Sequence, residues 1–379
     1  MEWVKLGDIA EIRKGKKVDQ CEEGINAVRY IQIEDLRHND EMKFTCDPKA
    51  VIANCEDVLI AWDGANAGTV SFDLEGAIGS TISKISIKEK KKKGLLPQYL
   101  GIFLQSKEDY LRQTATGATI PHINKQALLQ LAMPLFPLEI QNRLIELNNS
   151  LIGLIAKRRE QIDALDALVS SVFYELIFNE SDDKMPLGEL MSGFLAGKSL
   201  AGEKPSEFRV LKTSCVYSGY FDENEWKFLP VDYKPKEEHI VKFGDILVSR
   251  MNTEELVGAS AYVDKDYDDL AIPDRLWILR TNEAVSPLFL WKFFQTDLYR
   301  GLISKIATGT SGSMKNISKK NFSQIQVPLP KMEVQNRFAD VVTSIEAQKE
   351  SLRASLSELE TLFDALMQAA FSGHLNQSL

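Results

Sequence analysis

The sequence has few of the residues that build metal sites, disulfide frameworks or membrane spans. Its 379 residues include four cysteines and four histidines, without CxxC or Cys/His spacing, and this pattern argues against structural zinc. Cys21, Cys46, Cys55 and Cys215 are therefore expected to be isolated thiols. No apolar run approaches the length of a membrane span, and residues 1–20 hold no signal-peptide core. We expect a cytoplasmic protein with no membrane partner.

Catalytic motifs are also scarce. The stretch from Gly193 to Ser199 resembles a phosphate-binding loop, but three residues separate its glycines where that motif needs four. The glycine-rich stretch from Asp63 to Gly68 is typical of a turn and not of a dinucleotide-binding crossover. Motifs for base methylation or for nuclease chemistry are not found. We therefore expect a chain that carries out no catalysis and binds no cofactor or metal of its own.

The net charge of -9 at first argues against a nucleic-acid partner. The acidity is spread along the chain, so a local basic face remains compatible with it. Basic residues do cluster in three places: Arg13, Lys14, Lys16 and Lys17; residues 90–93; and Lys315, Lys319 and Lys320. For each cluster taken alone, a solvated loop is a better explanation than a phosphate contact.

The clearest positive feature is an internal repeat. Gln141-Asn142-Arg143 recurs 194 residues later as Gln335-Asn336-Arg337, each shortly after a proline-containing segment. An ordered series of further pairs accompanies it, with offsets that drift as loop insertions would produce: Leu6 and Leu187, Asp57 and Asp245, Pro97 and Pro287, Thr116 and Thr308, Ile123 and Ile317, Lys125 and Lys319. The chain is two copies of one unit.

Each copy begins as a mixed α/β (α+β) globular domain and ends in a long helix. Short strands are expected at 58–61, 69–72, 82–87, 246–249, 260–263 and 276–280. Pro97 and Pro287 each open a helix, predicted to run to about Gln113 and Ile303. The expected domains are 1–136 (first recognition domain), 137–180 (first spacer helix), 181–330 (second recognition domain) and 331–379 (second spacer helix).

Apolar residues in the two long segments alternate in steps of three and four, which is a coiled-coil pattern. The predicted seams are Ile140, Leu144, Leu147, Leu151, Leu154, Leu165, Leu168 and Val172, and Val334, Phe338, Val341, Ile345, Leu352, Leu359, Leu362 and Leu366. Polar residues interrupt them at Arg158, Gln161, Gln348 and Ser355. We expect the two helices to pair with each other as an antiparallel coiled coil with pseudo-twofold symmetry.

The loop before each long helix concentrates hydroxyls, amides and lysine, which suit contacts to phosphate oxygens. The candidates are Thr116, Gly117, Thr119, Asn124 and Lys125 in the first copy and Thr308, Gly309, Ser311, Lys315 and Lys319 in the second. The same residues are good turn formers, so an ordinary turn explains them equally well.

Base recognition in a DNA groove needs Arg, Lys, Asn or Gln side chains that reach base edges. Arg250, Asn252 and Arg275 are candidates in the second copy, and Asn66 lies in the corresponding region of the first. Lys198 follows Gly197 as Lys16 follows Gly15, and it completes the set of candidate DNA-binding residues. Differing polar residues on matched scaffolds are typical of two domains that recognise different sequences, but also of unselected loops.

These motifs together resemble the specificity subunit of type I restriction-modification systems. The resemblance covers the whole chain: the opening at residues 4–9, the Asp-Val-Leu-Ile and Gly-Asp-Ile-Leu-Val-Ser-Arg strands, the Thr-Gly loops, Pro-Leu-x-Pro followed by Gln-Asn-Arg, and the ending from Ala370. The family's usual Glu-Gln before the helix arginine is Glu-Ile-Gln-Asn or Glu-Val-Gln-Asn here.

The resemblance implies a DNA-binding subunit without catalytic activity. Each recognition domain would read one half of a bipartite site in double-stranded DNA, and the helices would set the spacing and dock two modification (methyltransferase) subunits. S-adenosylmethionine, ATP and Mg would belong to partner subunits, including the restriction (endonuclease/translocase) subunits.

Two alternatives remain open from the residues alone. A structural coiled-coil scaffold would also show the long apolar seams. A DNA-mimic inhibitor would be acidic, although it should cluster its carboxylates on one face, whereas Asp and Glu here are interspersed with Lys and Arg. A fused catalytic polypeptide is disfavoured because methyltransferase motifs are not found.

Overall fold

The computed structural model describes residues 2–38, 42–117, 119–180, 183–309 and 314–372; the side chains of 178–180 lie outside that description. Contacts divide these residues into two compact units. Unit 1 holds residues 2–159 and 354–372, and unit 2 holds Glu160–Arg353. Each unit therefore contains one copy of the repeat together with part of each long helix.

Unit 1 is built on a four-stranded antiparallel sheet of order β2-β9-β6-β7. A second, mixed sheet has the order β4-β3-β8-β5, and β1 pairs with β10. The strands are β1 (Glu2–Lys5), β2 (Ala10–Lys14), β3 (Val28–Ile31), β4 (Phe44–Thr45), β5 (Ile52–Ala53), β6 (Val58–Ala61), β7 (Val70–Ser71), β8 (Gly76–Ile78), β9 (Ile82–Ile87) and β10 (Ala132–Leu135). The helices are α1 (Leu6–Ile9), the 3-10 helix η1 (Glu34–Leu36), α2 (Pro97–Gln105), α3 (Glu108–Gln113), α4 (Lys125–Gln130) and the first part of α5 (Leu138–Glu180).

Unit 2 repeats this plan with a sheet of order β12-β19-β15-β17 and a sheet of order β14-β13-β18. Two small ribbons, β11-β21 and β16-β20, complete it. The strands are β11 (Lys184–Pro186), β12 (Met191–Leu195), β13 (Arg209–Leu211), β14 (Trp226–Phe228), β15 (Ile246–Ser249), β16 (Met251–Asn252), β17 (Ser260–Tyr262), β18 (Leu270–Ala271), β19 (Leu276–Thr281), β20 (Lys315–Asn316) and β21 (Gln326–Pro328). The helices are η2 (Leu187–Leu190), η3 (Thr213–Val216), η4 (Glu237–His239), α6 (Pro287–Phe293), α7 (Asp297–Ile306), α8 (Lys319–Ser323) and the first part of α9 (Met332–Ser372).

The matching sheet orders confirm the mixed α/β content expected of each copy. Strands β6 and β15 are buried along their whole length because alternate residues face opposite cores. Val58 and Ile60 face the core beneath α2, whereas Leu59 faces the second sheet. Ile246 and Leu247 divide in the same way in unit 2.

The single helix predicted after each proline is wrong, because each copy has two helices there. In unit 1 the chain leaves α2 at Ser106, whose hydroxyl donates to the Phe103 carbonyl at 2.7 Å. Thr296 makes the same bond to Phe293 at 2.7 Å and also caps α7 by accepting from the Tyr299 N–H. A hydroxyl that bonds the backbone competes with helix propagation, which explains the break.

Within the predicted spacer segments the helices span Leu138–Glu180 and Met332–Ser372, with residues 373–379 outside the described residues, and part of the predicted seam is wrong by one residue. Leu154, Leu168, Val341 and Leu362 are between 38% and 55% exposed. Their neighbours Val169 and Val342 are buried instead. The buried stripe passes through polar residues, including Asn148 and Lys349, so an apolar count alone misplaces it. Leu144, Leu151, Phe338 and Ile345 are buried as predicted.

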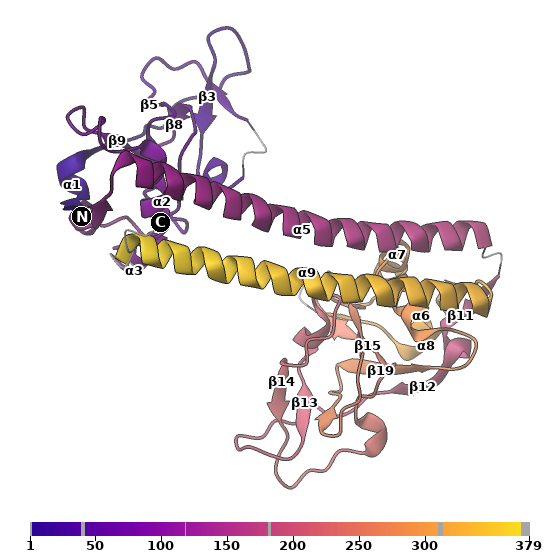
Figure 1. Cartoon of the computed structure of the whole chain (residues 1–379). Coiled ribbons are helices and arrows are strands. Elements are labelled where there is room, and N and C mark those ends of the chain that lie inside the picture. Colours follow the sequence, from indigo (N-terminus) through magenta and orange to yellow (C-terminus); the bar gives the residue numbers. More distant parts are fainter. Residues whose placement is uncertain (1, 39–41, 118, 181–182, 310–313, 373–379) are drawn as a thin grey trace. The chain divides into compact units, whose positions relative to one another are not determined.

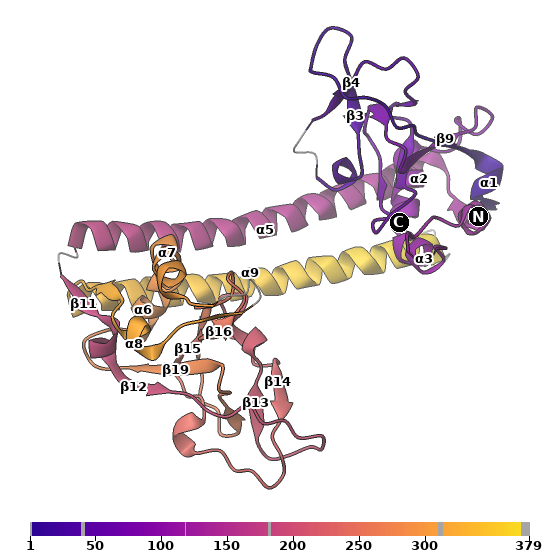
Figure 2. The ribbon, with the colours of Figure 1, turned by 180° about the vertical axis from the view of Figure 1, so that it is seen from behind.

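Within each unit, the segments of the two long helices share one core. In unit 1 the last turns of α9 lie beside α2, where Phe371 contacts Phe103 with ring centroids 5.3 Å apart (Figures 1 and 2). Arg158 and Ser355, two of the predicted polar interruptions, bond to each other at 3.2 Å. In unit 2, Phe173 of α5 contacts Phe338 of α9 at 5.3 Å.

The buried glutamine of each Gln-Asn-Arg motif joins the long helix to the domain before it. Gln141 accepts from the N–H of Leu96, which precedes α2, and donates to the Gly94 and Phe136 carbonyls. Gln335 accepts from the N–H of Ser286, which precedes α6, and likewise donates to two carbonyls. Because both glutamines are buried, these bonds satisfy side-chain amide atoms that would otherwise be unpaired.

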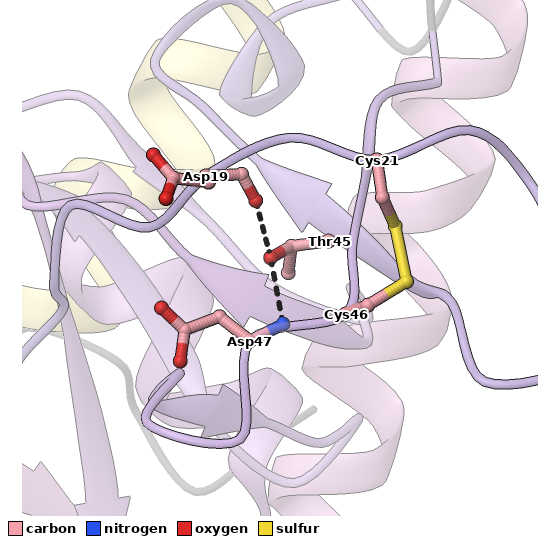
Figure 3. Close-up of a disulfide and its surroundings, with 5 residues drawn as sticks. All are labelled: Asp19, Cys21, Thr45, Cys46 and Asp47. Atoms are coloured by element: carbon pink, nitrogen blue, oxygen red, sulfur yellow. Dashed lines mark hydrogen bonds between the residues drawn. A yellow bond between two sulfur atoms is a disulfide. The ribbon is translucent and has the colours of Figure 1, made fainter.

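The expectation of isolated thiols is wrong for two of the cysteines. Cys21 and Cys46 form a disulfide that ties the segment after β2 to the end of β4 (Figure 3). Beside it, the Thr45 hydroxyl donates to the Asp19 carbonyl at 2.7 Å and accepts from the Asp47 N–H. Cys55 and Cys215 are free, and burial raises the pKa of the Cys215 thiol.

Candidate nucleic-acid interface

The candidate residues of unit 1 lie on a frame formed by three segments that are distant in the sequence. The N–H of Ile123 donates to the Trp62 carbonyl at 3.0 Å, and the N–H of Gly64 donates to Pro121 at 2.9 Å. Thr116 and His122 exchange two backbone hydrogen bonds, at 2.9 and 2.7 Å. These bonds hold the turn after β6 against the Thr-Gly loop.

Unit 2 has the same frame. The N–H of Ile317 donates to the Arg250 carbonyl at 2.9 Å, as Ile123 does to Trp62. Thr308 and Asn316 exchange the bonds that Thr116 and His122 make, at 2.9 and 2.8 Å. The frame residues are thus equivalent in pairs while their side chains differ: Trp62 and Arg250, Asp63 and Met251, His122 and Asn316.

In unit 1 a carboxylate occupies the centre of the frame. Asp63 accepts from Lys14 Nζ at 2.5 Å and contacts His122 Nδ1 at 2.6 Å. Partial burial opposes ionisation of Asp63, but the bonds from Lys14 and His122 outweigh it and lower the pKa of the carboxyl. At neutral pH this group is therefore an ionised acceptor, which can bind an exocyclic amine of a base.

In unit 2 the equivalent positions hold a cation, an apolar side chain and an amide. The Arg250 guanidinium lies over the Trp277 ring, 5.9 Å from its centroid. Asn252 donates to the hydroxyls of Tyr217 and Ser249 at 2.9 and 3.2 Å and accepts from the Thr253 N–H. Since these bonds occupy the amide, Asn252 positions Tyr217.

Gly15-Lys16 and Gly197-Lys198 each lie where two chain segments cross closely. A Cβ on Gly15 would lie 2.4 Å from the Ile78 carbonyl oxygen, and one on Gly197 would lie 1.9 Å from that of Ile272. The glycines therefore permit a backbone contact and do not form a phosphate-binding loop. The lysines beside them, Lys16, Lys17 and Lys198, are exposed, and Lys198 lies over the Tyr233 ring.

Several candidates in the Thr-Gly loops have structural roles of their own. Asn124 caps α4 by accepting from the N–H groups of Gln126 and Ala127 at 3.1 Å, which is the usual role of an N-cap. Gly117 has a φ of +103°, a conformation that favours glycine. Lys319 packs over the Phe194 ring at 4.5 Å. Lys315 pairs with Glu254 at 3.5 Å.

The remaining candidates divide into those near the frame and those away from it. The Arg275 carbonyl accepts from the Arg250 N–H at 3.0 Å, which places Arg275 at the frame of unit 2. Arg13 precedes Lys14 on β2, so the two side chains face opposite sides of the sheet. Asn66 is half-buried, Thr116, Thr119, Lys125, Thr308 and Gly309 are exposed, and Ser311 lies outside the described residues.

Comparison with known proteins assigns the family. The model of the type I restriction modification DNA specificity domain matches residues 1–164 and 202–361, once over each copy. The chain belongs to the family of type I restriction-modification specificity subunits.

Relatives within this family match nearly the whole chain or about half of it. The type I restriction enzyme MjaVIII specificity subunit of Methanocaldococcus jannaschii is 28% identical over 99% of this chain and 92% of its own length. The EcoEI specificity subunit of Escherichia coli is 29% identical over 51% of this chain and 36% of its own length. The crystal structure of the specificity subunit from M. genitalium shares the fold, with a TM-score of 0.59, 16% identity and coverage of 98% of this chain and 96% of that one.

The described residues also lack two other features, a membrane-spanning helix and a metal-binding cluster. Among them, no helix combines the length and apolar character that a membrane crossing needs. In the same residues, no three His, Cys, Asp or Glu side chains come together as a metal site.

Sequence reasoning missed several residues that this specificity-subunit frame brings into place. His122 shares Asp63 with Lys14, although neither lies near it in the sequence. In unit 2 the Tyr217 hydroxyl contacts Thr213 at 2.9 Å as well as Asn252, and Lys212 and Lys227 line a groove beside it. No spacing rule could have found them, because the repeat is least regular there.

Proposed function

We propose that this specificity subunit recognises a bipartite site in double-stranded DNA, with one half-site read by each copy. The observation that carries the proposal is the equivalence of the two frames. Their backbone bonds match in pairs, while the side chains they present differ in charge and polarity. Two copies of one scaffold that present different side chains suit an asymmetric DNA site. The reason is that each base pair offers its own set of hydrogen-bond donors and acceptors, which different side chains recognise.

The reading residues of the first copy would be Lys14, Asp63 and His122. A carboxylate accepts from cytosine N4 or adenine N6, and the Lys14 ammonium and the His122 ring beside it can also reach phosphate oxygens. In the second copy Arg250 could bind guanine, and Met251 could contact a thymine methyl group.

The long helices would form an antiparallel coiled coil that sets the distance between the half-sites. Support comes from contacts inside each unit: Arg159 of α5 pairs with Glu360 of α9 at 2.7 Å, and Phe173 contacts Phe338. A helix of about 40 residues is about 60 Å long, which accommodates half-sites one DNA turn apart, about 34 to 36 Å.

Exposed apolar residues on the helices would dock two modification (methyltransferase) subunits. Leu154, Leu168, Val341 and Leu362 are exposed although they recur at helical spacing. Apolar side chains of this kind are typical of protein interfaces when they lie together. In such a complex the partners would supply S-adenosylmethionine, and restriction subunits would supply ATP- and Mg-dependent steps. This chain would contribute recognition and no catalysis.

Exchange of residues 185–330 for the second domain of another family member tests the proposal. The complex with modification subunits should then methylate a site with one new half and one unchanged half, as mapped by methylation sequencing. A change in both halves, or no methylation from a folded complex, would contradict modular recognition. DNA binding lost altogether would favour the scaffold or DNA-mimic alternative.

Insertion of one heptad into both α5 and α9 tests the spacing role. Seven residues add about 10 Å, so the tolerated spacer should lengthen by about three base pairs. An unchanged spacer would remove the helices as the determinant of spacing.

A further inference from the structure

The Cys21–Cys46 disulfide anchors a segment that carries two of the candidate DNA-binding residues. This segment, residues 15–21, leaves β2 and bears the exposed side chains of Lys16 and Lys17. At its start the Lys16 N–H donates to a carbonyl of β8 at 3.2 Å, and at its end lies the disulfide (Figure 3). The two lysines are therefore held between a backbone crossing and a covalent link.

Two hydrogen bonds accompany the disulfide at the end of the segment. The Cys21 N–H donates to the Phe44 carbonyl at 2.9 Å, and the Thr45 hydroxyl donates to the Asp19 carbonyl at 2.7 Å. Both bonds go to β4, a strand of two residues at the edge of its sheet. A short edge strand opens more readily than a central one, so the covalent link contributes much of the anchor.

Strand register identifies the equivalent junction of unit 2. In both units the pairing aligns a phenylalanine, Phe44 of β4 or Phe228 of β14, with an arginine. The carbonyl of this phenylalanine accepts from the Cys21 N–H at 2.9 Å in unit 1 and from the Gly202 N–H at 2.7 Å in unit 2. Gly202 is therefore the counterpart of Cys21.

Backbone packing takes the place of the disulfide in unit 2. Pro230, two residues after the aligned phenylalanine, stands where unit 1 has Cys46. A Cβ on Gly202 would lie 2.6 Å from the Leu229 carbonyl oxygen, so the two main chains are in direct contact. The cysteine that the sequence gives unit 2, Cys215, is fully buried. Of the two junctions, the one in unit 1 is the one that thiol chemistry can open.

The disulfide is within reach of a reductant, because Cys46 is exposed and Cys21 is half-buried. A subunit that binds DNA works among cellular thiol reductants. Disulfides in such surroundings are usually transient, and many of them sense the redox state.

We propose that Cys21 and Cys46 form a redox switch of the first copy. The disulfide holds the segment of Lys16 and Lys17 in its DNA-binding position, and reduction releases that segment while the second copy is unaffected. This inference rests on the proposed function, since it adds control to the same DNA complex.

The electron balance requires a dithiol for opening and a disulfide oxidant for closure. A thiolate of the dithiol attacks the Cys46 sulfur, and Cys21 leaves as a thiolate that takes a proton. The second thiol of the reductant then displaces Cys46, so the protein gains two electrons and two protons and the dithiol becomes a disulfide. In closure a small-molecule disulfide accepts the same electrons and protons and becomes two thiols.

Hydrogen exchange in the full-length subunit tests the release of the segment. The Cys55→Ser background removes the exposed free thiol, and the protein is prepared with oxidised glutathione or with dithiothreitol. Alkylation followed by mass spectrometry should find Cys21 and Cys46 blocked in the first sample and labelled in the second. Amides of residues 16–21 should exchange about tenfold faster after reduction. The equivalent segment of unit 2, residues 197–202, is the matched control and should not change.

DNA binding in the complex with modification subunits tests the functional consequence. Affinity for the duplex that carries the mapped site should be about tenfold lower after reduction, because the segment must then be ordered on binding. The variant Cys21→Ser, Cys46→Ser should bind like the reduced protein and should not respond to dithiothreitol, which also controls for thiols of the partner subunits.

A lysine variant shows whether the segment carries the effect. Lys16→Ala, Lys17→Ala should remove the difference between the two redox states, since the contacts that the switch controls are then lost. The matched control Lys90→Ala, Lys93→Ala removes two exposed lysines of unit 1 outside the segment and should keep the tenfold difference.

Three results would overturn the switch: free thiols at Cys21 and Cys46 after oxidation, equal affinity in the two redox states, or an undiminished difference without Lys16 and Lys17. Each of them leaves the proposed function intact, because sequence-specific binding is then independent of the cysteines. A wild-type complex without sequence-specific binding in either redox state would contradict the proposed function itself.

Discussion

The two units solve the same packing problem with different chemistry where the long helices meet the recognition domain. In unit 2, Lys349 of α9 is fully buried and contacts Asp166 of α5, Glu346 and the Tyr220 hydroxyl. The residues 194 positions before Glu346 and Lys349 are Ile152 and Ile155, and both are apolar. The repeat thus preserves backbone geometry, while the side chains where the long helices meet the domain differ between the two copies, as the candidate base-reading residues do.

Loss of Lys349 should give the largest effect. Lys349→Met leaves Asp166 without this buried cation, while Glu346 keeps its contact with Lys292 at 3.4 Å, and we expect unit 2 to lose about 3 kcal/mol of unfolding free energy. Hydrogen exchange across a urea titration should show lower protection in α6 and unchanged protection in α2. The matched variant Asp166→Leu, Lys349→Met should recover most of the loss, since it keeps the contact between Lys292 and Glu346 and removes the Lys349–Asp166 pair as a whole. Equal protection of α6 in the single variant and the wild type would contradict a stabilising role for the cluster.

The buried glutamines should behave alike in both units. Gln141→Leu leaves the Leu96 N–H unpaired, and Gln335→Leu does the same to Ser286. Each should cost about 1 to 3 kcal/mol, with the loss of protection centred on the start of α2 or α6. Gln126→Leu, on the exposed face of α4, is the control and should be nearly neutral. A large difference in the loss of unfolding free energy between the two glutamine variants would contradict the equivalence of the two helix-to-domain junctions.

The Asp63 carboxylate should affect only one half-site. Asp63→Asn removes the ionised acceptor, and we expect discrimination at one base pair of the first half-site to fall by about 1 to 3 kcal/mol. Competition binding with duplexes altered in either half-site measures this. Asp109→Asn, an exposed acid on α3, serves as the control. Reduced discrimination in the second half-site would contradict the assignment of copies to half-sites.

The smallest effect concerns pH. Burial lowers the pKa of His239 in unit 2, so the folded state favours the neutral ring. Its contribution to stability is complete above the unfolded value of about 6.5 and is lost as pH falls through the lower folded pKa. His239→Gln should therefore flatten the stability of unit 2 between about pH 7 and 5, measured by urea unfolding. If the stability of unit 2 depends on pH in the same way in the variant and in the wild type, His239 is excluded as the source of that dependence.

The sequence predicted the features that depend on local pattern. The repeat located Gln141 and Gln335, and alternation located β6, β9 and β15 at the observed residues. Prediction from the sequence failed where tertiary contacts determine the local structure. The Ser106 and Thr296 hydroxyls interrupt helices whose apolar pattern continues, and buried polar residues such as Asn148 displace the inward stripe. Cys21 and Cys46 lack a pairing signal.

The candidate site shows the same division. Arg250 and Asn252 were predicted as candidates because they follow a recognisable strand, but the bonds that make Asn252 a positioning residue join it to Tyr217, 35 residues away. Lys212 and Lys227 lie on segments whose backbone pairing recurs in the first copy with different side chains, since Gln32 and Lys43 stand at the equivalent positions. Their placement follows from the fold and not from spacing.

The most direct test of the central claim makes the chain symmetric. Residues 184–328 are replaced by residues 2–135, so that both positions carry the first copy, and methylation is mapped in the complex with modification subunits. If each copy reads one half-site, the modified site should be an inverted repeat of the first half-site with the original spacer. An asymmetric site that retains the second half, in a folded and active complex, would contradict the account.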